Sequence, residues 1–153
     1  MSFLIRLAQS PDVTELAKMR ALLWPDGSLA EHEKELSLAL GGNAVSTLPT
    51  ATFVAASEDG ALIGFLEAGL RSHADGCDTT RLVGFVEGWF VHEEFRGRGV
   101  GEELMRAAED WARSNGCREM ASDALIDNDA SIQVHQALGF EIVDRCVHFR
   151  KNL

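Results

Sequence analysis

One short stretch of the chain combines glycine and arginine in a pattern typical of ligand binding: residues 95–101, Phe-Arg-Gly-Arg-Gly-Val-Gly. It follows an apolar segment over 82–91 and precedes apolar residues at helical spacing. Glycines at a strand-to-helix turn let the backbone bend closely around a ligand. The free N–H groups at the start of a helix carry a partial positive charge, which favours a phosphate. A simple turn would have the same composition, so the surroundings must decide.

The spacing within this loop argues against two common nucleotide sites. No Lys-Ser/Thr pair follows Gly101, as a nucleotide P-loop requires. The acidic residue and βαβ continuation of a dinucleotide site are also missing. The order Arg96-x-x-Gly99-x-Gly101 after a strand instead resembles the pyrophosphate loop of the GCN5-related N-acetyltransferases (GNAT family). In that family the loop holds acetyl-coenzyme A (acetyl-CoA).

Length and composition indicate a single domain over residues 1–153, large enough for a hydrophobic core. No apolar run approaches the roughly 20 residues of a membrane span, and the first residues lack the pattern of a signal peptide. Three widely spaced cysteines, Cys77, Cys117 and Cys146, indicate neither a disulfide framework nor a metal site. We therefore expect a reduced, cytoplasmic protein without a bound metal.

The formal net charge of −10 bears on the choice of partner. Nucleic-acid phosphates need clustered lysine and arginine, so we expect no nucleic-acid binding. An acidic surface attracts and concentrates a cationic small molecule. The charge is equally consistent with a role in solubility alone.

The periodicity predicts an α/β fold: a mixed, mostly antiparallel sheet with helices on both faces. One helix is expected from the N-cap Ser10 to Trp24-Pro25, and a second between the capping box Ser28-x-x-Glu31 and Gly41-Gly42. A third carries Val100, Leu104, Ala107, Ala108 and Trp111 before Gly116, and a fourth covers 128–138 before Gly139. The expected strands are 3–7, 52–56, 61–70, 82–91, 118–123, 140–143 and 145–150.

Local matches along most of the chain make the resemblance more specific. The segments 87–91 (Glu-Gly-Trp-Phe-Val), 116–123 (Gly-Cys-Arg-Glu-Met-Ala-Ser-Asp) and 134–140 (Val-His-Gln-Ala-Leu-Gly-Phe) are similar to the aminoglycoside 6'-N-acetyltransferases. So are 23–25 (Leu-Trp-Pro) and 75–78 (Asp-Gly-Cys-Asp). The resemblance implies acetyl transfer from acetyl-CoA to the 6'-amine of an aminoglycoside, and a homodimer with the C-terminal strands close to the partner.

The resemblance also implies which residues hold the coenzyme. Those assigned to the pantetheine arm and acetyl group are Trp89, Phe90 and Val91, through their backbone. Those assigned to the pyrophosphate, through their amides, are Gly97, Arg98, Gly99, Val100, Gly101 and Glu102. Arg96 and Arg98 add positive charge, although both could equally be solvated surface residues. Asn128 contacts coenzyme A in relatives, and a helix N-cap explains it equally well.

Glu87 is the acid expected to act in catalysis. With strict alternation it shares a strand face with Phe85 and Trp89 inside an apolar run, unless a bulge changes the alternation. A carboxylate there is costly without a partner or a task. We expect Glu87 to bind the substrate's ammonium groups and to accept the proton of the reacting amine, directly or through water. The alternative is a buried salt bridge to an arginine.

Four more residues are assigned to the substrate by the resemblance. Asp123 follows a strand and could otherwise cap the 123–128 loop, whereas Trp24 could otherwise be ordinary core packing. Asp144 would reach the substrate of a neighbouring subunit, with surface charge as the alternative. His73 lies in a loop that is shorter here than in relatives.

The general acid is the main departure from the family pattern. Many relatives place a tyrosine on the last helix near the leaving sulfur, and this chain contains no tyrosine. His135 occupies the corresponding place and could donate a proton or be a packed, hydrogen-bonded histidine. Two rival functions remain: an acetyltransferase for a polyamine or peptide amine, and an acyl-CoA-binding module without catalysis.

Overall fold

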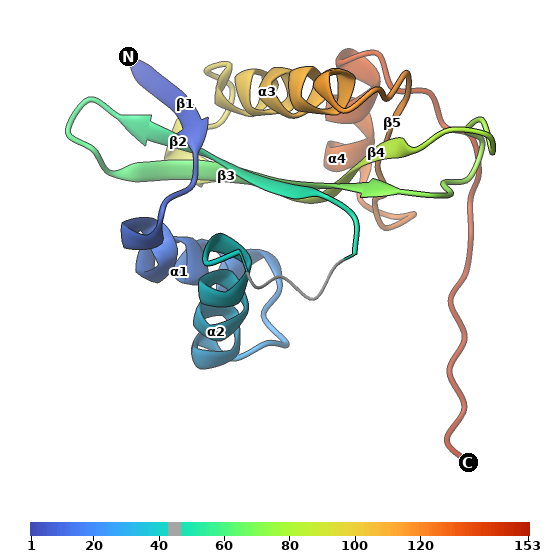
Figure 1. Cartoon of the computed structure of the whole chain (residues 1–153), viewed down its shortest axis with the longest axis horizontal. Helices are drawn as coiled ribbons and strands as arrows, with labels where there is room; N and C mark the ends of the chain where they lie inside the picture. Colours follow the sequence, from blue (N-terminus) through green and yellow to red (C-terminus); the bar gives the residue numbers. More distant parts are fainter. Residues whose placement is uncertain (43–46) are drawn as a thin grey trace.

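The computed structural model describes residues 1–42 and 47–153 and shows a five-stranded sheet in the order β1-β2-β3-β4-β5 (Figure 1). The strands are β1 (Phe3–Leu7), β2 (Thr50–Ser57), β3 (Leu62–Arg71), β4 (Val83–Val91) and β5 (Met120–Ala121). The helices are α1 (Val13–Leu23), α2 (Leu29–Leu40), α3 (Val100–Ser114) and α4 (Asp129–Ala137), with 3-10 turns η1 (Ser10–Asp12) and η2 (Glu93–Phe95). Every neighbouring strand pair is antiparallel except β4 with β5. The mixed, mostly antiparallel sheet is therefore confirmed.

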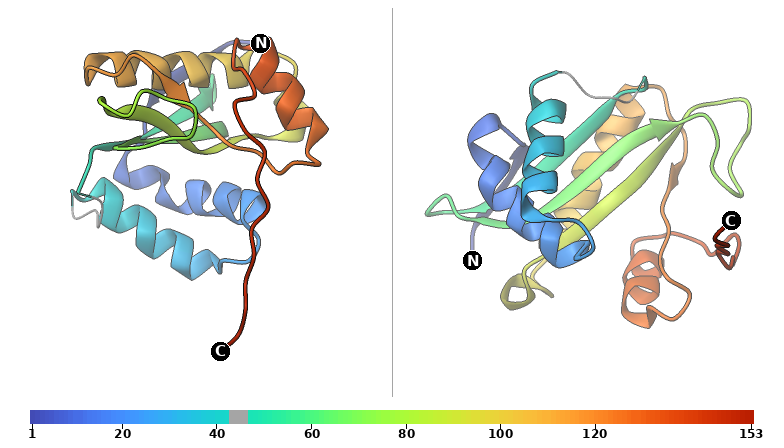
Figure 2. Two further views of the ribbon diagram at one scale, coloured as in Figure 1. Left: turned by 90° about the vertical axis from the view of Figure 1, so that its right-hand side faces the viewer. Right: turned by 90° about the horizontal axis from the view of Figure 1, so that it is seen from below.

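Helices cover both faces of the sheet, as expected. Helices α1 and α2 lie against one face and α3 lies against the other (Figure 2). Apolar residues of α3, including Val100, Leu104 and Ala108, pack with Leu66 and Val86 of the sheet. Another cluster joins α1, α2 and the opposite face through Leu16, Met19, Leu36, Val54 and Phe65. The site described below depends on which of these two faces each strand residue occupies.

Local sequence signals set most element ends. The Ser28 hydroxyl accepts from the Glu31 amide at 3.1 Å and the Glu31 carboxylate accepts from the Ser28 amide at 3.0 Å, so the predicted capping box is present. The first helix begins differently from the prediction. Its N-cap is Asp12 rather than Ser10, because a 3-10 turn over Ser10–Asp12, itself preceded by the N-cap Gln9, leads into α1. The proline at position 11 lies inside this turn.

An ion pair fixes that turn against the sheet. Arg6 of β1 bonds both carboxylate oxygens of Asp12, at 2.7 and 2.9 Å, and the Gln9 amide donates to the same group at 2.7 Å. The Arg6 hydrogen bonds lower the pKa of the buried Asp12 carboxyl, against the opposing effect of burial. This carboxylate therefore stabilises the fold above its ordinary pKa of 3.8, and the contribution is lost as the pH falls through the lower folded-state value.

We expect Asp12→Asn to lower the free energy of unfolding at neutral pH by about 2 kcal/mol, because charged hydrogen bonds are lost at a buried site. Urea denaturation at pH 7 measures this change. The difference from the unsubstituted protein should shrink as the pH is lowered below 3.8. The exposed Asp26 provides a control, since Asp26→Asn removes the same charge without these contacts. Equal destabilisation by the two changes would contradict the assignment.

A bulge between β3 and β4 decides the orientation of Glu87. In the register, Glu67 is opposite Gly88 and Ala68 is opposite Val86, so Glu87 has no opposite residue. Trp89 packs with the α3 side of the sheet, whereas Glu87 reaches across to Arg71. Strict alternation predicted that Glu87 and Trp89 share a face; the bulge named as the exception is present, and one extra residue in the strand places them on opposite faces.

The two parallel strands β4 and β5 pair only briefly. Gly84 is opposite Met120 and Phe85 is opposite Ala121, so the predicted strand over 118–123 is shorter than expected. Beyond this point β4 continues from 86 to 91 with no further pairing to β5 in the described ranges. This leaves one edge of β4 free directly before the glycine-rich loop.

The C-terminal segment is the largest departure from the predicted fold. Residues 140–143 and 145–150 are not strands: Phe140 packs against the core and Val143 lies beside Gly76, and the chain after Val143 extends away from the sheet (Figures 1 and 2). Its apolar side chains lie in solvent, with Val147 70% and Phe149 93% exposed. The alternating pattern alone could not form strands, because a strand also needs a neighbour to hydrogen bond.

Candidate functional site

The glycine-rich loop presents backbone amides to open space. Gly97 and Gly99 have φ angles of +71° and +84°, a conformation that other residues rarely adopt. Gly99 is the N-cap of α3, and no side chain caps this helix start. A Cβ built on either glycine would meet nothing within 4 Å. The first amides of α3 are therefore available to an anion of diphosphate size, which fits the pyrophosphate of acetyl-CoA.

The arginines of this loop have different surroundings. Arg96 donates from Nε to the Val91 carbonyl at 2.8 Å and so ties the loop to the end of β4. Arg98 is exposed, 5.9 Å from the centre of the Phe95 ring. Unlike Arg96, Arg98 has no hydrogen bond to β4 among the described residues. Arg96 therefore makes a structural contact within the domain and is not simply a solvated surface residue.

Trp89 lies under the loop, on the side of the sheet covered by α3. A Cβ on Gly101 would come within 3.2 Å of the Trp89 ring, so a larger residue at 101 could not sit here without displacement. The Trp89 indole N–H is buried and has no hydrogen-bond acceptor. Phe90, the next residue, packs towards α1 instead. Trp89 packs in the cluster under α3 and Phe90 in the cluster under α1 and α2, so this part of β4 is anchored on both faces.

On the opposite face, Glu87 forms an ion pair that opens to solvent. Arg71 of β3 bonds its two carboxylate oxygens at 3.0 and 2.8 Å, and the same guanidinium lies 3.5 Å from the centre of the Phe85 ring. The side chains of Glu87 and Arg71 are 39% and 44% exposed. The arginine partner weighed as an alternative is present, but the pair is half-exposed rather than buried. A carboxylate so placed remains accessible to a cationic ligand.

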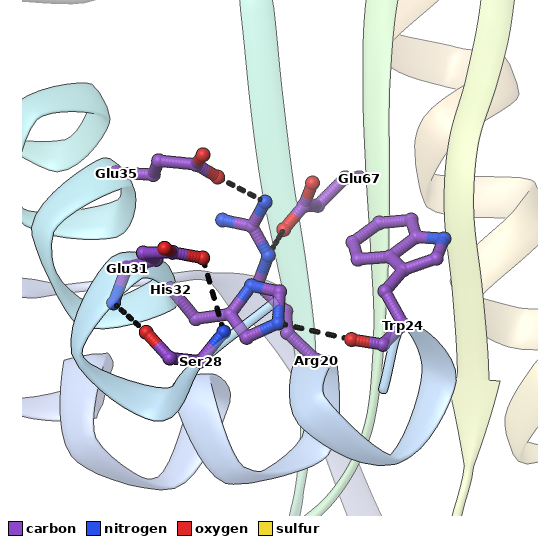
Figure 3. Close-up of polar contacts among 7 residues, drawn as sticks. All are labelled: Arg20, Trp24, Ser28, Glu31, His32, Glu35 and Glu67. Atoms are coloured by element: carbon purple, nitrogen blue, oxygen red, sulfur yellow. Dashed lines mark hydrogen bonds and ion pairs between the residues drawn. The ribbon is translucent and has the colours of Figure 1, made fainter. Parts of the chain in front are cut away.

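Trp24 provides a flat wall beside this carboxylate. It ends α1, and its ring covers Gly88, where an added Cβ would lie 2.4 Å from the ring. The Arg20 guanidinium lies 5.2 Å from the ring centre, and His32 of α2 donates from Nε2 to the Trp24 carbonyl at 3.2 Å (Figure 3). Trp24 is thus held by α1 and α2 over Gly88 at the β4 bulge, and Gly88 directly follows Glu87 in the chain.

Next to Trp24, on the same face of the sheet, lies a mostly buried polar cluster that the sequence interpretation missed. Arg20 donates to the Glu35 carboxylate at 2.8 Å, and its Nε lies 3.3 Å from Glu67 Oε1 (Figure 3). Burial raises the pKa of Glu67 above its ordinary value, with the Arg20 charge opposing this rise. A lone acid within the apolar strand 62–71 was the available signal, and it is the same signal that led to Glu87.

His135 and Asn128 both make local hydrogen bonds. His135 Nδ1 lies 2.7 Å from the Ser131 carbonyl and therefore carries the proton, which leaves Nε2 to accept from the Ser122 hydroxyl at 2.7 Å. Its ring contacts Trp89 edge-on, with centroids 5.4 Å apart. Asn128 caps α4 by accepting from the Ser131 amide at 3.1 Å. These contacts match the packed-histidine and N-cap alternatives; neither excludes a contact with the coenzyme.

Three predicted substrate residues lie exposed outside this group. His73 is near Asp75, with 3.5 Å between Nε2 and Oδ1, in the loop before β4. Asp123 follows β5, at the end of the short parallel pair. Asp144 belongs to the extended C-terminal segment, where it accepts from the Arg145 amide. The single chain therefore brings Trp24 and Glu87 together, but does not bring Asp144 to them.

Two further kinds of chemistry would depend on the cysteine thiols and on side chains that could bind a metal. All three cysteines are free thiols, and burial raises the pKa of Cys77 and Cys117. A higher pKa means less of the nucleophilic thiolate at neutral pH. Among the residues described, no group of three or more histidine, cysteine or acidic side chains could hold a metal ion. No helix in those same residues is both long and apolar enough to cross a membrane.

Comparisons with known proteins agree with this geometry. Residues 16–140 match the model of the acetyltransferase (GNAT) family. The chain is 41% identical over 150 residues to an aminoglycoside N(6')-acetyltransferase type 1 of Klebsiella aerogenes, covering 98% of this chain and 97% of that protein. It is 42% identical over 134 residues to a protein of the same name from Salmonella typhimurium, covering 87% and 88%.

Two solved structures extend the similarity to three dimensions. One is AAC(6')-Iy in complex with the bisubstrate analog CoA-S-monomethyl-acetylneamine, with 36% identity, a TM-score of 0.82 and full coverage of both chains. The other is the 6'-N-acetyltransferase AAC(6')-Ih from Acinetobacter baumannii, with 32% identity, a TM-score of 0.85 and 99% coverage of both chains. The similarity therefore spans the loop, the β4 bulge and the extended C-terminal segment alike.

Proposed function

Because this chain belongs to the GNAT acetyltransferase family, we propose that it is an enzyme that transfers acetyl from acetyl-CoA to the 6'-amine of aminoglycoside antibiotics. The main support is the arrangement around β4. Its free edge leads into the anion-binding loop, while Glu87 and Trp24 lie on the face covered by α1 and α2. One strand thus separates a coenzyme side from a cation-binding side. Acetylation removes a positive charge from the drug, which would weaken its binding to ribosomal RNA and give resistance.

The coenzyme side fits acetyl-CoA, which supplies an activated acetyl carbon when bound. We assign the backbone of Trp89, Phe90 and Val91 to the pantetheine arm, because this edge of β4 has polar groups free of β5. The loop amides from 97 to 102 would hold the diphosphate at the start of α3. His135 of α4 lies on the α3 side of this edge, where it contacts Trp89, and we assign Asn128, the N-cap of the same helix, to the coenzyme as well. The chain's part here is to hold and orient the thioester.

The substrate side needs negative charge and a flat apolar surface. We assign Glu87 to an ammonium group of the drug and Trp24 to a sugar ring. Asp123 would supply a second carboxylate from the end of β5. The amine attacks the acetyl carbon directly, without an enzyme nucleophile, consistent with the raised pKa of Cys77 and Cys117.

Thiol release from acetyl-CoA, measured against a panel of amines, tests this proposal. The panel contains kanamycin, tobramycin, spermidine and a peptide amine. We expect turnover with the two aminoglycosides and little with the others. Turnover of spermidine or the peptide alone would identify the polyamine or peptide alternative. Acetyl-CoA binding without turnover of any amine would identify a non-catalytic binding module.

We expect Glu87→Gln to lower kcat/KM for the aminoglycoside by about tenfold or more, mainly through KM, because the neutral amide no longer attracts an ammonium group. Steady-state kinetics measure this effect, and calorimetry should show unchanged acetyl-CoA affinity. Asp110→Asn is the matched control, since Asp110 is an exposed acid on α3 and its replacement alters net charge equally. Unchanged kinetics in Glu87→Gln would remove Glu87 from the site.

We further propose a homodimer in which the C-terminal segment contacts the partner. The support is the exposed apolar side chains of this segment, such as Phe149, and its extension away from the sheet (Figure 1). In such a dimer Asp144 would reach the neighbouring subunit's substrate. The cytoplasm is the location we propose, since all three cysteines are free thiols.

Removal of residues 142–153 is expected to convert the dimer to a monomer, because the exposed apolar side chains that would contact the partner are lost. Sedimentation velocity measures the change directly. Phe149→Ser in the full-length chain is a milder companion variant and should weaken the dimer. A full-length chain that sediments as a monomer at high concentration would contradict the proposed assembly.

A further inference from the structure

Glu67 is a second carboxylate on the substrate side of the sheet. It is the only acid in β3, and its side chain, 16% exposed, points towards α1 and α2 (Figure 3). Its Oε1 atom is buried without a hydrogen bond, although Arg20 Nε lies 3.3 Å away. Within the described residues, four buried side-chain polar atoms lack a hydrogen bond, and three belong to this cluster: Arg20 Nε, His32 Nδ1 and Glu67 Oε1. The cluster therefore retains unused hydrogen-bonding capacity.

Register places this carboxylate beside the site where acetyl transfer is proposed. Glu67 is directly opposite Gly88 in the register. The Trp24 ring packs over Gly88, and the next residues of β4, from Trp89 to Val91, are those assigned to the coenzyme. The bulge brings Glu87 to the same face, and Glu87 is close enough to affect the ionisation of Glu67. Two carboxylates from neighbouring strands thus lie on one side of the β4 bulge.

The surroundings of these two carboxylates differ. Glu87 is bonded through both oxygens by Arg71, and its side chain is 39% exposed, so it keeps acceptor positions open to solvent. Glu67 has an ion pair with Arg20 but no hydrogen bond at Oε1, and burial raises its pKa. A mostly buried carboxylate with an unbonded oxygen is suited to accept a proton, and an exposed carboxylate held by an arginine is suited to bind positive charge.

We propose that Glu67 is the catalytic base that accepts the proton of the substrate's reacting ammonium group, while Glu87 binds the substrate. This inference rests on the proposed acetyltransferase function. The ammonium N–H bond breaks and its proton forms the Glu67 carboxylic acid. The neutral nitrogen then forms the N–C bond to the acetyl carbon, and the C–S bond breaks. The second amine proton passes to the departing thiolate, and Glu67 later releases its proton to water.

The charged groups around Glu67 set the expected pH dependence. They are Arg20 of α1, His32 and Glu35 of α2, and Glu87 of β4. Burial is the largest influence, and it favours the protonated acid. Since the base must be ionised, kcat/KM should fall as the pH is lowered through the raised Glu67 pKa. This acid limb should lie above the ordinary glutamate pKa of 4.5.

Glu67→Gln tests the proposal through its pH profile. At pH 7 we expect kcat to fall by roughly 100-fold or more, the usual contribution of a general base, with acetyl-CoA affinity unchanged. Without a base, the reaction requires amine that has already lost its proton in solution. The rate should therefore rise about tenfold per pH unit and approach that of the unsubstituted enzyme in alkaline solution. A merely structural role would lower the rate by the same factor at every pH.

Glu35→Gln is the matched control, since it removes the other carboxylate bound to Arg20 from an exposed position. Its kcat at pH 7 should stay close to that of the unsubstituted enzyme, and its acid limb should remain and move only towards lower pH, because the Glu35 charge raises the Glu67 pKa. If Glu67→Gln does not fold, Glu67→Asp keeps a carboxylate but draws it back from the substrate, so kcat should fall and the acid limb should move. The proposal would be overturned if the acid limb of Glu67→Asp did not move. It would also be overturned if the pH profile of Glu67→Gln ran parallel to that of the unsubstituted enzyme. Failure of the unsubstituted enzyme to acetylate any panel amine would instead overturn the proposed function.

Discussion

Gly99→Val is expected to abolish measurable acetyl-CoA binding, reducing affinity by about 100-fold or more. Gly99 has φ +84°, which costs a β-branched residue of the order of 1–3 kcal/mol, so the loop would turn its amides away. The valine side chain would also enter the open space that we assign to the diphosphate. Because the added Cβ would meet nothing within 4 Å among the described residues beyond its own chain neighbours, the domain itself should still fold. Calorimetric titration with acetyl-CoA measures the loss.

Gly116→Val is the control for backbone strain. Gly116 has the same φ of +84° and equally open surroundings, but it follows the other end of α3. It should lose stability to a similar degree while binding acetyl-CoA normally. Normal affinity in a folded Gly99→Val protein would count against the loop assignment, and equal loss in both variants would attribute the effect to stability.

Gly88→Ala should lower kcat/KM for aminoglycosides by roughly 10- to 100-fold while leaving acetyl-CoA affinity unchanged. The backbone at 88 does not have a positive φ, so alanine is tolerated there. Its Cβ, however, would lie 2.4 Å from Trp24 Cη2 and 2.6 Å from Cζ2. The Trp24 ring must move away from the bulge, and the wall of the proposed substrate site moves with it. Kinetics at saturating acetyl-CoA measure this change.

A double-mutant cycle isolates the cause. Trp24→Phe removes the two ring atoms that collide with the new Cβ, so Gly88→Ala should cost much less in that background. If Gly88→Ala has the same effect with tryptophan and with phenylalanine, the contact between Trp24 and Gly88 is not responsible. The proposed position of the substrate would then need revision.

Features governed by neighbouring residues were predictable from the sequence. The capping box of Ser28 and Glu31, the N-cap Asn128 and the strand-loop-helix unit at 82–101 all form as expected. The prediction for β1 matches its observed bounds of Phe3–Leu7. These features depend on hydrogen bonds and backbone preferences within a few residues, which the sequence specifies directly.

The substrate side was only partly predictable. The lone-acid pattern identified Glu87, but its partner Arg71 is 16 residues away in the chain, and the bulge that turns Glu87 from Trp89 has no marker in the sequence. The same pattern around Glu67 gained meaning only from Arg20 and Trp24 beside it. Such contacts depend on register between strands and on helix packing, which composition does not specify.

The sequence by itself determined the family, the order of most elements and the glycine loop, because these depend on local spacing and backbone conformation. The tertiary structure decided which carboxylate is bonded by an arginine and which is buried without a hydrogen bond, namely Glu87 and Glu67. It also showed that 145–150 has no strand neighbour among the residues described, 1–42 and 47–153. Pairing and burial are relations between distant residues, so they exist only once the chain has folded.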